Sequence, residues 1–158
     1  MMKSIPVWKQ ELSDGVHAAR LASLYCCSPA ETASEAARYT AVLDGLEKTF
    51  GSHAEAGLYS APGRTEIGGN HTDHQHGRVL AGSVNIDMIA AAAPNDKNQL
   101  RVQSEGYDLC VIDLNDLEAR KEEENTTAAL LRGECAAFTQ RGAKLAGLDR
   151  KSTRLNSS

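Results

Sequence analysis

The sequence lacks several features that would each define a class of protein. No apolar run among its 158 residues approaches the roughly 20 residues of a membrane-spanning helix, which argues against a membrane protein. Its first 15 residues lack the apolar core of a signal peptide, so we expect a protein that is not exported. Basic residues are not in excess, because 17 of them face 21 acidic residues and the net charge is −4. This balance argues against a general nucleic-acid binder.

Cysteine is scarce, and its spacing forms neither a CxxC pair nor a zinc-like pattern. We expect Cys26, Cys27, Cys110 and Cys135 to be reduced thiols in the cytoplasm. What is present is the composition of a globular protein, with 41% hydrophobic and 24% charged residues. The length is sufficient for one domain with a core of its own.

Three segments have the apolar periodicity of helices. Ser28 and Glu31 form a capping box, and Gly51 is a plausible end, so we predict a helix between them. Its buried face would contain Ala36, Tyr39, Val42, Leu43, Leu46 and Phe50. A weaker pattern predicts a helix within residues 11–25. Another is predicted from Asn125 or Thr126 to about Arg141, with Ala129, Leu130, Cys135, Ala136 and Phe138 available for packing.

Short apolar or alternating segments separated by turn residues predict strands between the helix that ends near Gly51 and the helix that begins at Asn125 or Thr126. The segments are 58–61, 78–84, 87–93, 99–105 and 108–113. We expect them to form an antiparallel meander, with a turn at residues 94–98. The order of helices, strands and a final helix predicts the α+β class.

One segment, APGRTEIGGNHTDHQHG at residues 61–77, has four glycines and three histidines within 17 residues. We predict a loop, because this composition suits neither a half-buried strand nor an amphipathic helix. Three interpretations are open from composition alone. The segment could be a plain turn, or a metal site of His71, His74 and His76 with Asp73. The third is a sugar or polyol site in which Arg64 holds a phosphate. The histidine spacing matches no zinc pattern, so we expect no metal there.

Residues 63–74, GRTEIGGNHTDH, resemble the sugar-binding signature of galactokinases, members of the GHMP kinase superfamily. The usual form of that signature is G-R-x-N-[LIV]-I-G-E-H-T-D-Y. The resemblance covers roughly residues 43–148. Three positions depart from the pattern, because Glu66 stands where the family has Asn, Asn70 where it has Glu, and His74 where it has Tyr. Asn70 can still hydrogen-bond to a sugar hydroxyl, but without the charge.

The resemblance implies the N-terminal domain of a GHMP kinase, a ribosomal-protein-like α+β fold. It also implies an enzyme that transfers the γ-phosphoryl group of ATP, with Mg²⁺, to the anomeric hydroxyl of galactose in the cytoplasm. Arg64 would be the catalytic residue that stabilises the transition state. The implied substrate-binding residues are Asn70, His71, Thr72 and Asp73, and the glycines that shape the loop are Gly63, Gly68, Gly69 and Gly77.

The family's phosphate-binding run, P-x-G-x-G-L-S-S-S-A, is not found in the sequence, and the resemblance stops at about Leu148. The last ten residues, DRKSTRLNSS, can be read directly from the codons of a sequencing-library adapter. We therefore expect a partial N-terminal domain at residues 1–148 and a non-native tail at 149–158. The fragment itself is expected to be inactive. Two alternatives for the parent are a kinase for N-acetylgalactosamine and a non-catalytic regulator that binds galactose and ATP.

Overall fold

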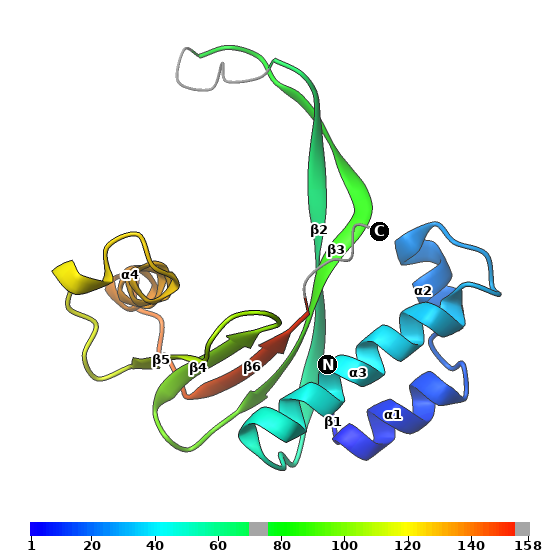
Figure 1. The fold of residues 1–158 in the computed structure, drawn as a ribbon, viewed down its shortest axis with the longest axis horizontal. Coiled ribbons are helices and arrows are strands. Elements are labelled where there is room, and N and C mark those ends of the chain that lie inside the picture. Colours follow the sequence, from blue (N-terminus) through cyan, green and yellow to red (C-terminus); the bar gives the residue numbers. More distant parts are fainter. Residues whose placement is uncertain (70–75, 154–158) are drawn as a thin grey trace.

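The computed structural model describes residues 1–69 and 76–153, which form a mixed α/β structure (Figure 1). None of the helices in these residues is both long enough and apolar enough to cross a bilayer. The elements are β1 (Met2–Lys3), α1 (Ile5–Ser13), α2 (Ala18–Tyr25), α3 (Thr32–Phe50), β2 (Ala56–Gly68), β3 (Leu80–Pro94), β4 (Gln99–Ser104), β5 (Cys110–Asp113), the 3-10 helix η2 (Lys121–Glu123), α4 (Thr127–Gln140) and β6 (Leu148–Ser152).

The six strands form one sheet in the order β1-β2-β3-β6-β4-β5. The predicted antiparallel meander is wrong in one respect, because β6 lies between β3 and β4 and pairs in parallel with β4. The predicted strands at 78–84 and 87–93 are a single strand, β3. The expected break between them is instead a shift in register against β2, between Pro62 and Arg64. A bulge of this kind bends a strand without ending it.

Helices cover the two faces of the sheet. Ile89, Ala91 and Ala93 of β3 are fully buried in one core with α1, α2 and α3. Val102 of β4 and Ile112 of β5 belong to a second core, with Leu131 of α4. Paired and alternating residues assign these cores to opposite faces, and Figure 1 shows α3 and α4 on different sides of the sheet.

The first helical region differs from its prediction in two places. The backbone N–H of Ser28 donates to the Glu31 carboxylate at 2.8 Å, which is half of the predicted capping box. The other half is wrong, because the Ser28 hydroxyl group donates to the same carboxylate and α3 begins only at Thr32. Gly51 ends that helix with a φ of +88°, as predicted. The segment 11–25 contains parts of two helices rather than one, because the chain turns at Gly15, which has a φ of +71°.

The last helix is capped as predicted, since Thr126 Oγ1 accepts a hydrogen bond from the N–H of Ala129 at 3.3 Å. Its buried face agrees with the prediction in part. Cys135 is buried as predicted, and so is Leu131, whereas Leu130 and Phe138 are more than half exposed. Only a narrow face of α4 is covered, because the strand that this helix contacts most is β5, at one edge of the sheet.

Asp149 in β6 is fully buried, although it is the first residue of the predicted tail. Its carboxylate accepts hydrogen bonds from Arg101 Nε at 2.6 Å, Asn95 Nδ2 at 2.7 Å and His53 Nε2 at 2.9 Å. Burial alone would raise the pKa of the carboxyl group, but these donors, with Arg101 foremost, lower it below its ordinary value. Asp149 is thus a fixed anion that joins β6 to β4 and to the segment after α3.

A group whose pKa is lowered by folding stabilises the protein above its unfolded pKa, about 4 for Asp. That stability is lost as the pH falls through the folded pKa. We therefore expect the free energy of unfolding to decrease on acidification below about pH 4. The Asp149→Asn variant should be less stable at pH 7 and should depend less on acid. Urea unfolding followed by circular dichroism measures both, with exposed Asp108→Asn as the control. Equal acid dependence in the two variants would contradict this role.

Candidate functional site

The segment singled out by the sequence lies at the far end of a two-stranded ribbon. Strands β2 and β3 continue beyond the helices as an arm that no other described element covers (Figure 1). Their pairing runs from Gly57 opposite Ala92 to Gly68 opposite Leu80. Two register shifts interrupt it, one after Pro62 and one after Glu66. Backbone hydrogen bonds between β2 and β3 are the main interactions that stabilise the outer part of the ribbon, because its side chains there are exposed.

The structure corrects the extent of the predicted loop. Gly63, Arg64 and Gly68 lie in β2, so the strand continues through the first half of residues 61–77. Residues 64–68, which are all exposed, form a strand rather than the predicted loop. Gly69 follows the strand directly, and Gly77 is an exposed residue shortly before β3. The four predicted sugar-binding residues lie outside the described residues, and their roles stay predictions: Asn70, His71, Thr72 and Asp73.

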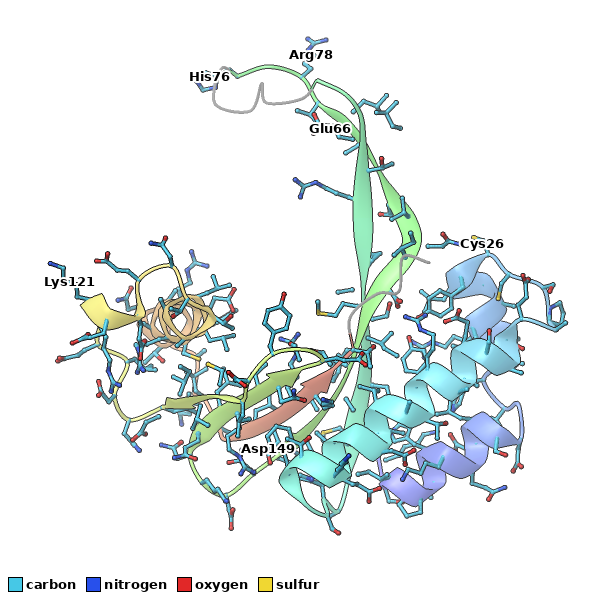
Figure 2. The ribbon with its side chains drawn as sticks, in the orientation of Figure 1. Cys26, Glu66, His76, Arg78, Lys121 and Asp149 are labelled. Atoms are coloured by element: carbon cyan, nitrogen blue, oxygen red, sulfur yellow. The ribbon has the colours of Figure 1, made fainter. Side chains whose placement is uncertain are left out.

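Arg64 is an exposed residue of β2, placed opposite Ser83 of β3. Within residues 1–69 and 76–153 its guanidinium group forms no ion pair. Regular pairing over residues 64–66 puts the Glu66 side chain on the same face of the ribbon. Figure 2 shows Glu66 near the outer end of the arm, where His76 and Arg78 also lie. A guanidinium group in such a place can bind a phosphoryl group through two parallel hydrogen bonds.

Gly69 has a backbone conformation that requires glycine. Its φ is +93°, and a Cβ at this position would lie 2.2 Å from the carbonyl oxygen of Arg78 and 2.9 Å from the Cα of Val79. Both atoms belong to the backbone of the opposite chain segment and cannot rotate away. Gly69 therefore fixes a close contact immediately before the predicted sugar-binding residues.

We expect Gly69→Ala in the intact parent protein to cost about 1–3 kcal/mol in strain at the end of the ribbon. Galactose binding should weaken by a corresponding factor, measured by isothermal titration calorimetry. Gly68→Ala is the matched control, because a Cβ there meets no atom within 4 Å. If both variants bind galactose alike, the conformation of Gly69 does not shape the site.

A second group of polar residues lies at the base of the ribbon, and sequence reasoning missed it. Asp87 of β3 is only 2% exposed and accepts hydrogen bonds from Tyr25 and Ser60 at 2.5 Å each and from Arg38 at 2.8 Å. The sequence contains one sign of it, a single carboxylate within the apolar run IDMIAAAA. A lone charge in a buried strand indicates buried partners.

The metal interpretation gains no support from the residues that can be described. Among residues 1–69 and 76–153, no group of three or more His, Cys, Asp and Glu side chains could hold an ion. His76 is exposed near the end of the ribbon, with a φ of +57°. The other predicted ligands, His71, Asp73 and His74, fall in the segment that is not described.

A family model of the galactokinase galactose-binding signature matches residues 46–94. This range includes β2, β3 and the whole predicted sugar-binding segment. The galactokinase of Ligilactobacillus salivarius is 35% identical over 83 residues, which are 51% of this chain and 21% of the relative. The galactokinase of Streptomyces coelicolor is 28% identical over 104 residues, covering 66% of this chain and 27% of the relative. The chain thus spans about a quarter of the length of these relatives.

The fold is similar to that in a crystal structure of Lactococcus lactis galactokinase complexed with galactose. The TM-score is 0.65 at 20% identity, over 75% of this chain and 31% of that chain. The predicted mixture of helices and strands is therefore confirmed, and the fold is similar to that of this galactokinase.

Proposed function

We propose that this chain is the sugar-binding part of a galactokinase, and that the parent protein phosphorylates galactose to galactose 1-phosphate with ATP. The observation that carries the proposal is the match of residues 46–94 to the galactokinase galactose-binding signature. The match covers the motif that the sequence analysis singled out, and it ends with β3, the strand that supports that motif. The similar galactokinases support the same conclusion.

In this proposal the ribbon contributes the sugar and charge contacts of the reaction. Asn70, His71, Thr72 and Asp73 would bind the sugar hydroxyls, and Asp73 would accept from two of them. Arg64 would stabilise the charge that develops on the transferred phosphoryl group. Phosphoryl transfer depends chiefly on positioning and on charge stabilisation, which residues fixed at one end of a ribbon can supply.

ATP and Mg²⁺ would be bound mainly by parts of the parent outside these 158 residues. The sequence has no phosphate-binding loop of the family's form, and the described residues have no cluster of metal ligands. Mg²⁺ would supply neutralisation of the phosphate charges. We place the reaction in the cytoplasm, where ATP is available and the four free cysteines would stay reduced. For the chain as it stands we propose no kinase activity.

We also propose that the part of this chain that belongs to the parent protein stops near Asp149 and that the residues after it are translated adapter. The three partners of the Asp149 carboxylate, His53, Asn95 and Arg101, all precede the junction. This favours a boundary after Asp149 rather than before it. Residues 150–152 complete β6 through backbone pairing with β3 and β4, and the buried Ser152 hydroxyl group also lies 2.9 Å from that of Ser104.

The test is an assay of the intact parent protein for ATP-dependent phosphorylation of sugars. We expect galactose to be phosphorylated well and N-acetylgalactosamine to be a poor substrate, because the similar proteins are galactokinases. If the parent protein prefers N-acetylgalactosamine, then that sugar, and not galactose, is its substrate. Binding of galactose without turnover would instead identify a non-catalytic regulator.

A further inference from the structure

Asp87 is a buried charged residue that the proposed mechanism does not use. It is 2% exposed and lies in β3 opposite Pro62, where the register shift between Pro62 and Arg64 begins. Two residues further along the arm, Asn85 Nδ2 still donates to the carbonyl oxygen of Tyr25 in α2 at 3.4 Å, and the outer part of the ribbon has no described helix beside it (Figure 1). Removing a carboxylate from water is costly unless hydrogen bonds and opposite charge compensate for it. The hydrogen-bond partners of Asp87 therefore indicate which elements this residue holds in place.

Three different elements donate to the Asp87 carboxylate. Ser60 Oγ of β2 and the hydroxyl group of Tyr25, the last residue of α2, each donate at 2.5 Å. Arg38 Nη2 of α3 donates at 2.8 Å and forms an ion pair. The hydroxyl group of Tyr39 lies 2.8 Å from that of Tyr25 and extends the network along α3. One carboxylate thus connects both strands of the ribbon to two helices.

The hydrogen-bond donors around Asp87 keep its carboxylate ionised. Burial raises the pKa of the Asp87 carboxyl group, but the hydrogen bonds from Ser60, Tyr25 and Arg38 outweigh it and leave the pKa below its ordinary value. Burial and the bond to Asp87 raise the pKa of Tyr25, so its hydroxyl group stays a donor. Hydrogen bonds to an ionised acceptor are shorter and stronger than neutral ones.

We infer that Asp87 is a positioning residue, which sets the direction of the ribbon and thereby the place of its sugar-binding end. The inference rests on the proposed function. The outer part of the ribbon has no core that could orient it, because Arg64 to Gly68 and Leu80 are exposed. Arg64 lies only four residues beyond Ser60, so a change of angle at the base displaces the catalytic group.

The test compares Asp87→Asn, Ser60→Ala and wild type in the intact parent, with exposed Asp108→Asn as the control. We expect the KM for galactose to rise by about tenfold or more in Asp87→Asn, since small displacements of positioned groups are costly. The KM for ATP should stay unchanged. Ser60→Ala should show a smaller rise in the same direction and covers the case in which Asp87→Asn does not fold. Hydrogen–deuterium exchange should quicken in residues 57–68 and 80–88 but not in α4.

The outcomes separate the inference from the function. If wild type phosphorylates galactose and both variants keep its KM and exchange pattern, the inference is wrong. Faster exchange throughout the protein would also overturn it, because that result indicates a purely structural role. If wild type does not phosphorylate galactose, the proposed function fails, and the exchange pattern alone decides on Asp87.

Discussion

Arg64→Ala in the intact parent protein is expected to lower the kcat of galactose phosphorylation by about 100- to 1000-fold. The KM for galactose should change much less. The reason is that the guanidinium group interacts more strongly with the transition state than with the bound sugar, since charge on the phosphoryl oxygens is redistributed during transfer. Loss of an interaction made mainly in the transition state lowers turnover rather than affinity.

Steady-state kinetics with galactose and ATP measure this effect. Arg64→Lys should recover only part of the loss, because an ammonium group retains the charge but not the two parallel donors of arginine. Arg141→Ala, which removes an exposed arginine at the end of α4, is the matched control. An Arg64→Ala enzyme with normal kcat and a raised KM would show that the residue only binds sugar.

Asp73→Ala is expected to abolish measurable galactose binding by the parent protein. In the proposed site this carboxylate accepts hydrogen bonds from two sugar hydroxyls, and each hydrogen bond to a charged group contributes about 1.5–3 kcal/mol. Losing both should weaken binding by about 100-fold or more. Isothermal titration calorimetry without ATP isolates this step from the chemistry.

The control for Asp73 is Asp108→Ala, which removes an exposed carboxylate between β4 and β5. Asp73→Asn adds a finer comparison, because the amide keeps the size of the carboxylate but has one acceptor oxygen instead of two. We expect its affinity to lie between those of wild type and Asp73→Ala. If the Asp73→Ala variant binds galactose with unchanged affinity, the sugar site does not include this carboxylate and the proposed site is wrong.

Local sequence chemistry predicted the helices better than the sheet. Thr126 and Gly51 cap helix ends through contacts within a few residues, so a short stretch of sequence is enough to predict these ends. The insertion of β6 between β3 and β4 depends on pairing between residues about 50 positions apart. Neither the composition of β6 nor its neighbours in the chain could indicate that position.

The sequence pointed to a candidate site where a motif marks it, and the roles of those residues stay predictions; it gave little sign of contacts that arise only from packing. Gly63, Arg64 and Gly69 were identified from an ordered string of residues. The burial of Asp87 depends on Tyr25, Arg38 and Ser60, which lie 27 to 62 positions away and meet it only in the folded chain. Such a network leaves little trace in one sequence beyond a charge in an apolar strand.

The most direct test of the whole account is to read the uninterrupted gene beyond codon 148. We predict that the native frame continues past Leu148 or Asp149 and soon encodes a phosphate-binding loop of the form P-x-G-x-G-L-S-S-S-A, followed by an aspartate and a further domain. A native frame that encodes RKSTRLNSS after Asp149 and then stops would contradict the account.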